Sequence, residues 1–341
     1  MVFPRALSAT AASAAPLFAL LSSVVSVTTK NHISRVSDIP QIGLGTWHSE
    51  ADKEKTTHVV EYALDIGYDH IDGAHIYGNE NKVGKGVAWA NIAREDIWIT
   101  SKLWNDDHRP DKVREAIKKS ISDLGVDYLD LYLMHWPVAF VPGEGTKLDK
   151  ETSIFDTWLA MEDLVRANLT RKIGISNFAK KDVENILKMC TICPYAHEFE
   201  THPYLQQQDF VDFHKEVGIK VIAYSPLANT NPTYGSGLEP ILKDPFWEFL
   251  AARKDATVPQ VILAWGIQRG TIVIPKSVHE QYIKENFEAQ SIKFTDDEMK
   301  DIAAQDKKAR MNNPGRSWGL KLFADLDDPT DLVGSKKSKE L

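Results

Sequence analysis

The alternation of short apolar runs with amphipathic segments is the feature that most restricts what this chain can fold into. From about residue 41 onward, eight short runs are typical of buried strands, at 41–44, 69–71, 97–100, 129–134, 172–175, 197–199, 220–223 and 271–274. Segments expected to be helical lie between or after them, at 53–66, 81–88, 110–124, 154–167, 180–188, 209–217, 258–268 and 280–286. Eight such alternations without a long linker favour a single-domain α/β fold, a closed (β/α)8 TIM barrel, over a doubly wound open sheet.

The helix expected at 110–124 shows the pattern most clearly. Its apolar residues Val113, Ile117, Ile121 and Leu124 recur at helical spacing, and Pro110 suits a first helical turn. In a barrel of this kind the active site is formed by the loops at the carboxyl ends of the strands. Candidate catalytic residues should therefore follow the strands in the sequence.

The net charge of the chain bears on which ligands it can bind. The chain has 341 residues, 43% of them hydrophobic, and a formal net charge of −8, which argues against a general nucleic-acid binder. A local basic pocket for one phosphorylated cofactor remains compatible with this charge. We expect a small-molecule substrate, no metal, and a monomer or weak homodimer.

The two ends differ from the barrel segment. Residues 1–37 contain no Asp or Glu, and residues 14–27 have the length of a signal-peptide apolar region. A transit peptide, a membrane anchor or a poorly ordered tail are the alternatives. The last four residues, 338–341, loosely resemble an endoplasmic-reticulum retrieval signal. We predict a leader at 1–30, the barrel at 31–325 and a charged tail at 326–341, with the secretory pathway favoured over the cytoplasm.

Cys190 and Cys193 are the only cysteines, and they form a single Cys-x-x-Cys. A redox motif would follow a strand, whereas this pair follows the helix expected at 180–188, and a zinc site would need a second pair. We interpret them as two loop thiols that would oxidise in an oxidising compartment.

Polar residues follow three successive strands of the predicted barrel. Asp72 and Tyr77 come after the strand at 69–71, Lys102 after that at 97–100, and His135 after that at 129–134. Each residue alone has an ordinary structural explanation, as a cap, a packing group or a satisfied histidine. Four such groups at the same ends of successive strands predict one polar site at the mouth of the barrel.

This set suits the reduction of a carbonyl group. Hydride addition places negative charge on the carbonyl oxygen, so a proton donor must stand beside it. A phenol is a reluctant donor, but a nearby ammonium lowers its pKa, and a carboxylate holds the ammonium in place. Tyr77, Lys102 and Asp72 supply these three groups, and His135 is expected to orient the carbonyl oxygen.

Eight segments, taken in order, resemble the signature segments of the aldo-keto reductase family. They are Gly43–Trp47, Asp72–Glu80, Ser101–Trp104, His135–Pro137, Gly174–Phe178, His202–Leu205, Tyr224–Leu227 and Ile274–Ser277, within a resemblance that covers about residues 33–318. The resemblance implies an enzyme that reduces aldehydes and ketones with NADPH, Tyr77 being the general acid. Aldoses and small hydroxyaldehydes are the expected substrates, and NADH is a second expected cofactor.

The resemblance also implies where the cofactor and substrate bind. The cofactor would lie across the barrel mouth without a Gly-x-Gly-x-x-Gly fingerprint, and none follows a strand here. Ser176, Asn177 and Tyr224 would hold the nicotinamide, and Lys276 and Ser277 the 2′-phosphate. The remaining expected cofactor residues are Thr46, Trp47, Glu198, Ser225, Leu227, Asn229, Tyr282, Glu285 and Asn286. The expected substrate residues are Trp47, Trp104, His135, Trp136 and Trp318.

Two positions depart from the family. Tyr282 stands where the family commonly has an arginine, which predicts a weaker preference for NADPH over NADH. Glu198 stands where the family has a glutamine that contacts the nicotinamide carboxamide. A carboxylate there would favour the oxidised, positively charged ring, unless Glu198 points elsewhere or carries a proton.

Two other functions compete with a reductase. A regulatory protein that binds cofactor with little turnover would be expected to lack one of the four polar residues, yet Asp72, Tyr77, Lys102 and His135 are all present. A metal-dependent barrel enzyme would need ligand spacing that His135 and His202 do not provide.

Overall fold

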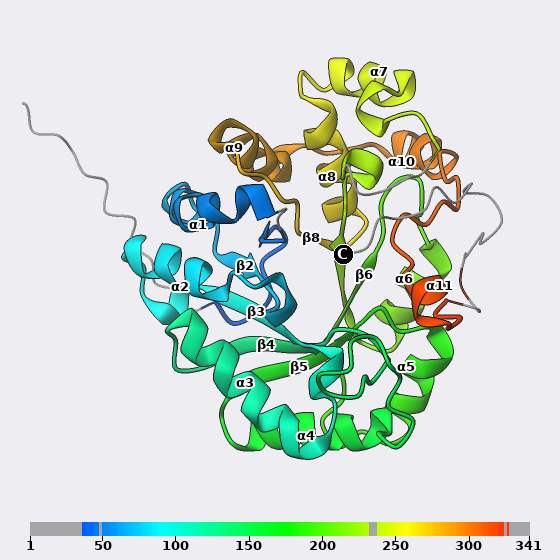
Figure 1. The fold of residues 1–341 in the computed structure, drawn as a ribbon. Coiled ribbons are helices and arrows are strands. Elements are labelled where there is room, and N and C mark those ends of the chain that lie inside the picture. Colours follow the sequence, from blue (N-terminus) through cyan, green and yellow to red (C-terminus); the bar gives the residue numbers. More distant parts are fainter. Residues whose placement is uncertain (1–35, 48–49, 232–236, 324–325, 327–341) are drawn as a thin grey trace, which may run out of the picture. The chain divides into compact units, whose positions relative to one another are not determined.

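Eight parallel strands, each paired with the next in the sequence, form the centre of the fold (Figure 1). The computed structural model describes residues 36–47, 50–231, 237–323 and 326. The strands are β1 Leu44–Gly45, β2 His70–Asp72, β3 Trp98–Leu103, β4 Leu129–Met134, β5 Thr170–Ser176, β6 Ala196–Glu200, β7 Lys220–Tyr224 and β8 Ile272–Val273. The predicted α/β class and strand order are confirmed.

The last strand also meets the first, which curls the sheet into a barrel. Ile42 and Val273 form a parallel bridge, the Gly43 amide donates to the Val273 carbonyl at 2.9 Å, and the Val273 amide donates to the Gln41 carbonyl at 3.0 Å. Closure leaves neither β1 nor β8 as an open edge. The predicted closed barrel is therefore what the chain adopts.

Helices surround the strands (Figure 1). They are α1 Thr56–Asp65, α2 Glu80–Trp89, α3 Pro110–Leu124, α4 Ile154–Arg166, α5 Lys180–Leu187, α6 Gln208–Glu216, α7 Pro245–Arg253, α8 Val258–Gln268, α9 Glu280–Glu288, α10 Asp296–Ala303 and α11 Gly315–Trp318. Short 3-10 turns include η1 Glu50–Lys55 and η2 His75–Tyr77. The sequence did not predict α7, α10 or α11. None of the described helices is long and apolar enough to cross a membrane.

Alternate residues of each strand face opposite sides of the barrel wall. In β4, Leu131 and Leu133 pack inward with Trp98, Ala196 and Ile222, while Tyr132 and Met134 pack outward against the helices. This alternation follows from the period of two in a strand. An ionisable residue in register with the inward set must therefore lie inside the barrel, and Lys102 in β3 and Glu198 in β6 are in that register.

The prediction for the cysteines can be compared with the structure, whereas the predictions for the two ends of the chain cannot. Cys190 and Cys193 form a disulfide just after α5, so they are not free thiols. The predicted leader at 1–30 and all but Leu326 of the predicted tail lie outside the described residues.

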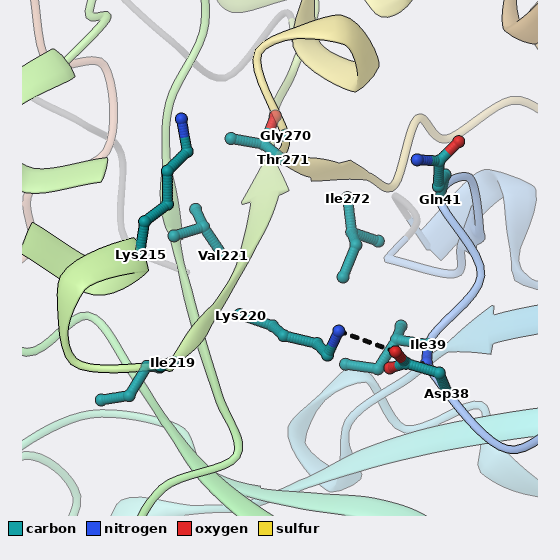
Figure 2. Close-up of a pocket in the computed structure, with 11 residues that line it drawn as sticks. Asp38, Ile39, Gln41, Lys215, Ile219, Lys220, Val221, Gly270, Thr271 and Ile272 are labelled. Carbon is teal, nitrogen blue, oxygen red and sulfur yellow. Dashed lines mark hydrogen bonds and ion pairs between the residues drawn. The ribbon is translucent and has the colours of Figure 1, made fainter. Parts of the chain in front are cut away.

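A cavity of about 440 Å³ lies at the amino ends of the strands (Figure 2). Its lining includes Ile219 and Lys220 at the start of β7 and Thr271 and Ile272 at the start of β8, and Lys220 pairs with Asp38 at 2.7 Å. Since Lys102, Asp72 and His135 lie at the carboxyl ends of their strands, this cavity is at the opposite end of the barrel from them.

Candidate active site

A buried lysine forms the centre of the polar cluster at the carboxyl ends of the strands. Lys102 is the fifth of six residues of β3, and it therefore lies within the strand and not in the loop that was predicted to hold it. Its ammonium donates to Asp72 Oδ1 at 2.6 Å and to the Gly73 carbonyl at 3.1 Å. Lys102 and Asp72 are both almost completely buried, so they form an ion pair shielded from solvent.

Tyr77 stands over this ion pair, at the end of the 3-10 turn η2 that follows β2. The Lys102 ammonium lies 5.4 Å from the centre of the Tyr77 ring. The pKa of Tyr77 is nevertheless raised, because burial and the carboxyls of Asp72 and Glu198 outweigh the effect of Lys102. The ammonium does lower this pKa, as expected from the sequence, but not by enough to offset burial. The phenol instead stays protonated, and it is available as an acid across the physiological pH range.

His135 faces Tyr77 from the end of β4. The two rings lie 5.9 Å apart in an edge-on arrangement, and His135 Nδ1 has no hydrogen-bond partner among the described groups. Burial, followed by the charge of Lys102, holds the pKa of His135 well below its usual value. A neutral imidazole can donate one hydrogen bond to a ligand without competing with Lys102 as a cation.

Glu198 is the residue whose placement changes the expected site. Its side chain points into the barrel from β6, and its Oε2 lies 3.2 Å from Lys102 Nζ. It is as buried as Asp72, and burial followed by the charge of Asp72 raises its pKa well above the usual value. Lys102 is thus flanked by two carboxyl groups.

Three of the expected nicotinamide residues meet at the ends of β5 and β7. Ser176 and Tyr224 are the last residues of their strands, and Asn177 follows in a left-handed conformation with φ 62°. The Asn177 amide donates to the His135 carbonyl at 3.0 Å, and the Tyr224 hydroxyl donates to Asn177 Oδ1 at 2.7 Å. This network links the expected nicotinamide residues to His135.

The residues expected to bind phosphate lie after β8. Lys276 is one-third exposed, with its Nζ 3.6 Å from Asp52 Oδ2, and Ser277 is buried beside it. Tyr282 is 54% exposed and packs edge-on against His279. The Lys276 amine is therefore exposed to ligands, although Asp52 offsets part of its charge.

The remaining expected cofactor residues have varied surroundings. Thr46 is buried, and its hydroxyl donates to the Asp72 carbonyl at 2.8 Å. Asn229 holds the loop before α7, because its amide donates to the Glu239 carbonyl and its oxygen accepts the Ile241 amide. Glu285 accepts a hydrogen bond from Gln281 at 2.8 Å, and Asn286 is buried. Ser225 and Leu227 lie in the turn that follows β7, where Ser225 has φ 47°.

Aromatic rings form one wall of the site. Trp104 lies 5.3 Å from His135, and Trp136 lies 5.1 Å from Trp318, both in edge-on contacts. Phe140, which the sequence analysis did not single out, connects them by contacting Trp104 at 6.4 Å and Trp318 at 5.2 Å. The wall therefore includes four of the five expected substrate residues. The fifth, Trp47, is half-buried after β1.

Glu200 is a second residue that the sequence analysis missed. This buried carboxylate accepts the backbone amides of Met311 at 2.7 Å and Asn312 at 2.9 Å, and it contacts His202 at 2.9 Å. It thereby fixes the start of the segment that carries Trp318. Its only signal in the sequence was an acidic residue at an inward position of a buried strand.

Comparison with known proteins agrees with this geometry. The model of the aldo/keto reductase family matches residues 41–307. The chain belongs to the aldo/keto reductase family. It is an oxidoreductase, and the resemblance found in its sequence is confirmed.

Individual relatives support the same assignment. An uncharacterized oxidoreductase of Schizosaccharomyces pombe is 43% identical over 302 residues, which cover 86% of this chain and 92% of that protein. Aldo-keto reductase family 1 member A1 of Sus scrofa is 38% identical, with 81% and 89% covered. The solved structure of aldose reductase from Giardia lamblia superposes with a TM-score of 0.76 at 37% identity, covering 83% of this chain and 98% of that one.

Proposed function

We propose that this enzyme uses NADPH to reduce aldehydes and ketones to alcohols, with aldoses and small hydroxyaldehydes as its main substrates. The contact between Tyr77 and the buried Lys102–Asp72 pair, opposite His135, carries the proposal. A proton donor, a cation that holds it and a neutral hydrogen-bond donor face one another there. These are the groups that carbonyl reduction requires.

The protein's part in the reaction is to deliver a proton and orient the carbonyl. A bound nicotinamide cofactor supplies the hydride. Tyr77 donates its hydroxyl proton to the carbonyl oxygen as negative charge develops there, and Lys102 stabilises the phenolate that remains. Asp72 keeps the ammonium in place, and His135 donates an N–H to the same oxygen. The reverse oxidation uses the same groups, with the Tyr77 phenolate accepting the proton.

The chemistry of the polar groups at the mouth fits a phosphorylated dinucleotide. An amine at Lys276 and a hydroxyl at Ser277 suit a phosphate monoester, and Asn177 and Ser176 offer an amide and a hydroxyl to a carboxamide. Asp52 lies near Lys276, and Tyr282 brings no positive charge. We therefore propose NADPH as the preferred cofactor, with NADH accepted at reduced affinity.

The aromatic wall supports the proposed substrate class. Trp104, Trp136, Trp318 and Phe140 present ring faces and edges beside His135. Such a surface packs against the apolar face of a sugar and equally against an unfunctionalised aldehyde. Small hydroxyaldehydes would place their carbonyl at Tyr77 and their carbon chain against these rings.

An absorbance assay of NADPH and NADH oxidation across aldehydes, ketones, aldoses and uronic acids tests the function. We expect turnover with aldoses and hydroxyaldehydes, a higher kcat/KM with NADPH than with NADH, and strong loss of activity in Tyr77→Phe. Oxidation of neither nucleotide by any carbonyl would overturn the proposed function, and a higher kcat/KM with NADH would overturn the cofactor preference.

A further inference from the structure

Two buried carboxyl oxygens beside Lys102 have no hydrogen-bond donor. The ammonium donates to Asp72 Oδ1 at 2.6 Å and to the Gly73 carbonyl at 3.1 Å. The geometry leaves Glu198 Oε2 without a hydrogen bond, although it lies only 3.2 Å from the nitrogen. Asp72 Oδ2 also receives no hydrogen bond from any described group.

A single proton shared between the two carboxyl groups gives both of these oxygens a hydrogen-bond partner. Both carboxyl groups lie against the same ammonium, with Asp72 Oδ1 at 2.6 Å and Glu198 Oε2 at 3.2 Å from Lys102 Nζ. Two carboxyl groups can be hydrogen-bonded to each other only when one of them carries a proton. Buried polar atoms without a partner are costly, and two buried carboxylates beside one cation would leave an uncompensated charge. A protonated Glu198 that donates to Asp72 pairs both carboxyl oxygens and removes the uncompensated negative charge.

The other groups facing Glu198 do not supply this proton or neutralise the extra charge. Its neighbours across the sheet are Ser176 in β5 and Ile222 in β7, and neither is ionisable in this range. His70, Tyr77 and His135 complete the ionisable surroundings of the cluster. Burial lowers the pKa of His70 to about 4, so all three are neutral. Lys102 is therefore the single cation among these groups.

We propose that Glu198 is a carboxylic acid that donates its proton to Asp72, so that the Lys102–Asp72–Glu198 cluster is electrically neutral. Loss of that proton then sets the preference for the oxidised cofactor. With a glutamine at this position the cluster would have the same net charge, one cation and one carboxylate. The glutamate adds a negative charge that appears only when the proton is lost.

This proton has two consequences, which rest on the function proposed above. After the proton leaves, the cluster gains one negative charge at the site of the nicotinamide, and attraction favours the positively charged NADP+ over NADPH. The same charge makes Tyr77 a weaker acid, because negative charge beside a phenol opposes its ionisation. Glu198 thus links both the preferred oxidation state of the bound cofactor and the acidity of Tyr77 to pH.

Infrared spectra of the unliganded protein test the proton directly. We expect a protonated-carboxyl carbonyl band at neutral pH in the wild type that disappears in Glu198→Gln. Glu200→Gln is the matched control, since Glu200 lies on the same strand and already accepts two backbone amides. The band should persist there. Identical carboxyl bands in the wild type and Glu198→Gln would overturn the proposal.

Equilibrium binding tests the consequence for the cofactor. In the wild type, the ratio of the NADP+ to the NADPH dissociation constant should fall at least about tenfold over the pH range in which the infrared carboxyl band of Glu198 disappears. The ratio should stay constant in Glu198→Gln. A constant ratio in the wild type would overturn the role of Glu198 in cofactor preference. If neither nucleotide binds, the proposed function fails, and the infrared band still decides whether Glu198 carries the proton.

Discussion

Strand β6 carries two buried polar networks on its opposite faces, and they differ in how completely they are satisfied. On the inner face Glu198 joins a cation and a second carboxyl, with two oxygens left without donors. On the outer face His197 Nδ1 lies 2.8 Å from His214 Nε2, His197 Nε2 accepts the Phe178 amide, and His214 Nδ1 lies 2.6 Å from the Phe210 carbonyl.

The outer network is complete when both histidines are neutral. His197 Nδ1–H then donates to His214, and His214 Nδ1–H donates to the Phe210 carbonyl, which leaves no ring nitrogen without a partner. Burial lowers the pKa of both rings, that of His214 to about 4. A neutral network with every polar atom paired stabilises the fold. The inner network instead holds charged groups and carboxyl oxygens without donors, which is typical of a catalytic site.

Removing the ammonium of Lys102 should disrupt the inner network and have the largest effect on activity. In Lys102→Met the acid Tyr77 loses its supporting charge and two carboxyls face each other without a cation. We expect kcat to fall by about 10²-fold or more. Steady-state NADPH oxidation measures this, with circular dichroism to confirm folding. The matched control is Lys172→Met, which removes an exposed lysine from β5. Near wild-type turnover in Lys102→Met would contradict the role given to the ammonium.

Acid should break the outer network. Because the pKa of His214 in the folded state lies below 6.5, its neutral form contributes stability that is present above about pH 6.5 and is lost as the pH falls toward 4. The loss from this residue should reach about 3 kcal/mol. Urea unfolding at a series of pH values measures it. In His214→Gln, which keeps an acceptor for His197 but does not titrate, the dependence should be shallower. An unchanged dependence would rule out the pair as its source.

Much of the architecture could be predicted from the sequence, because the spacing of apolar residues and the residues at the ends of the segments indicate most strands and helices. The strand β4 and the helices α3 and α8 have the predicted bounds, since each combines a clear apolar pattern with distinct ends. Helix α7 was missed because it lies outside the eightfold alternation and exposes Phe249, so its apolar residues do not mark one buried face. The end of β3 was placed too early because Ser101 and Lys102 are polar, although both are buried.

The position of a site residue could be predicted where it depends only on the end of the strand that carries or precedes that residue. Tyr77 and His135 follow their strands as expected, whereas Asp72 is the last residue of β2 and does not lie in the loop after it. These three side chains and Lys102 form one cluster. The contact of Glu198 with Lys102 could not be foreseen, because it depends on the register of two strands that are not neighbours in the sheet. Phe140 lies in the long connection between β4 and α4, where no periodicity marks a contact with Trp318.

Single-turnover hydride transfer in Tyr77→Phe tests the central claim most directly. Wild-type enzyme and variant are saturated with NADPH, mixed with excess aldehyde, and followed by the loss of nicotinamide absorbance. Removing one hydroxyl should leave NADPH affinity unchanged and slow the transfer by at least about 10²-fold, because the developing alkoxide has lost its proton donor. A transfer rate equal to that of the wild type would contradict the assignment of Tyr77 as the acid.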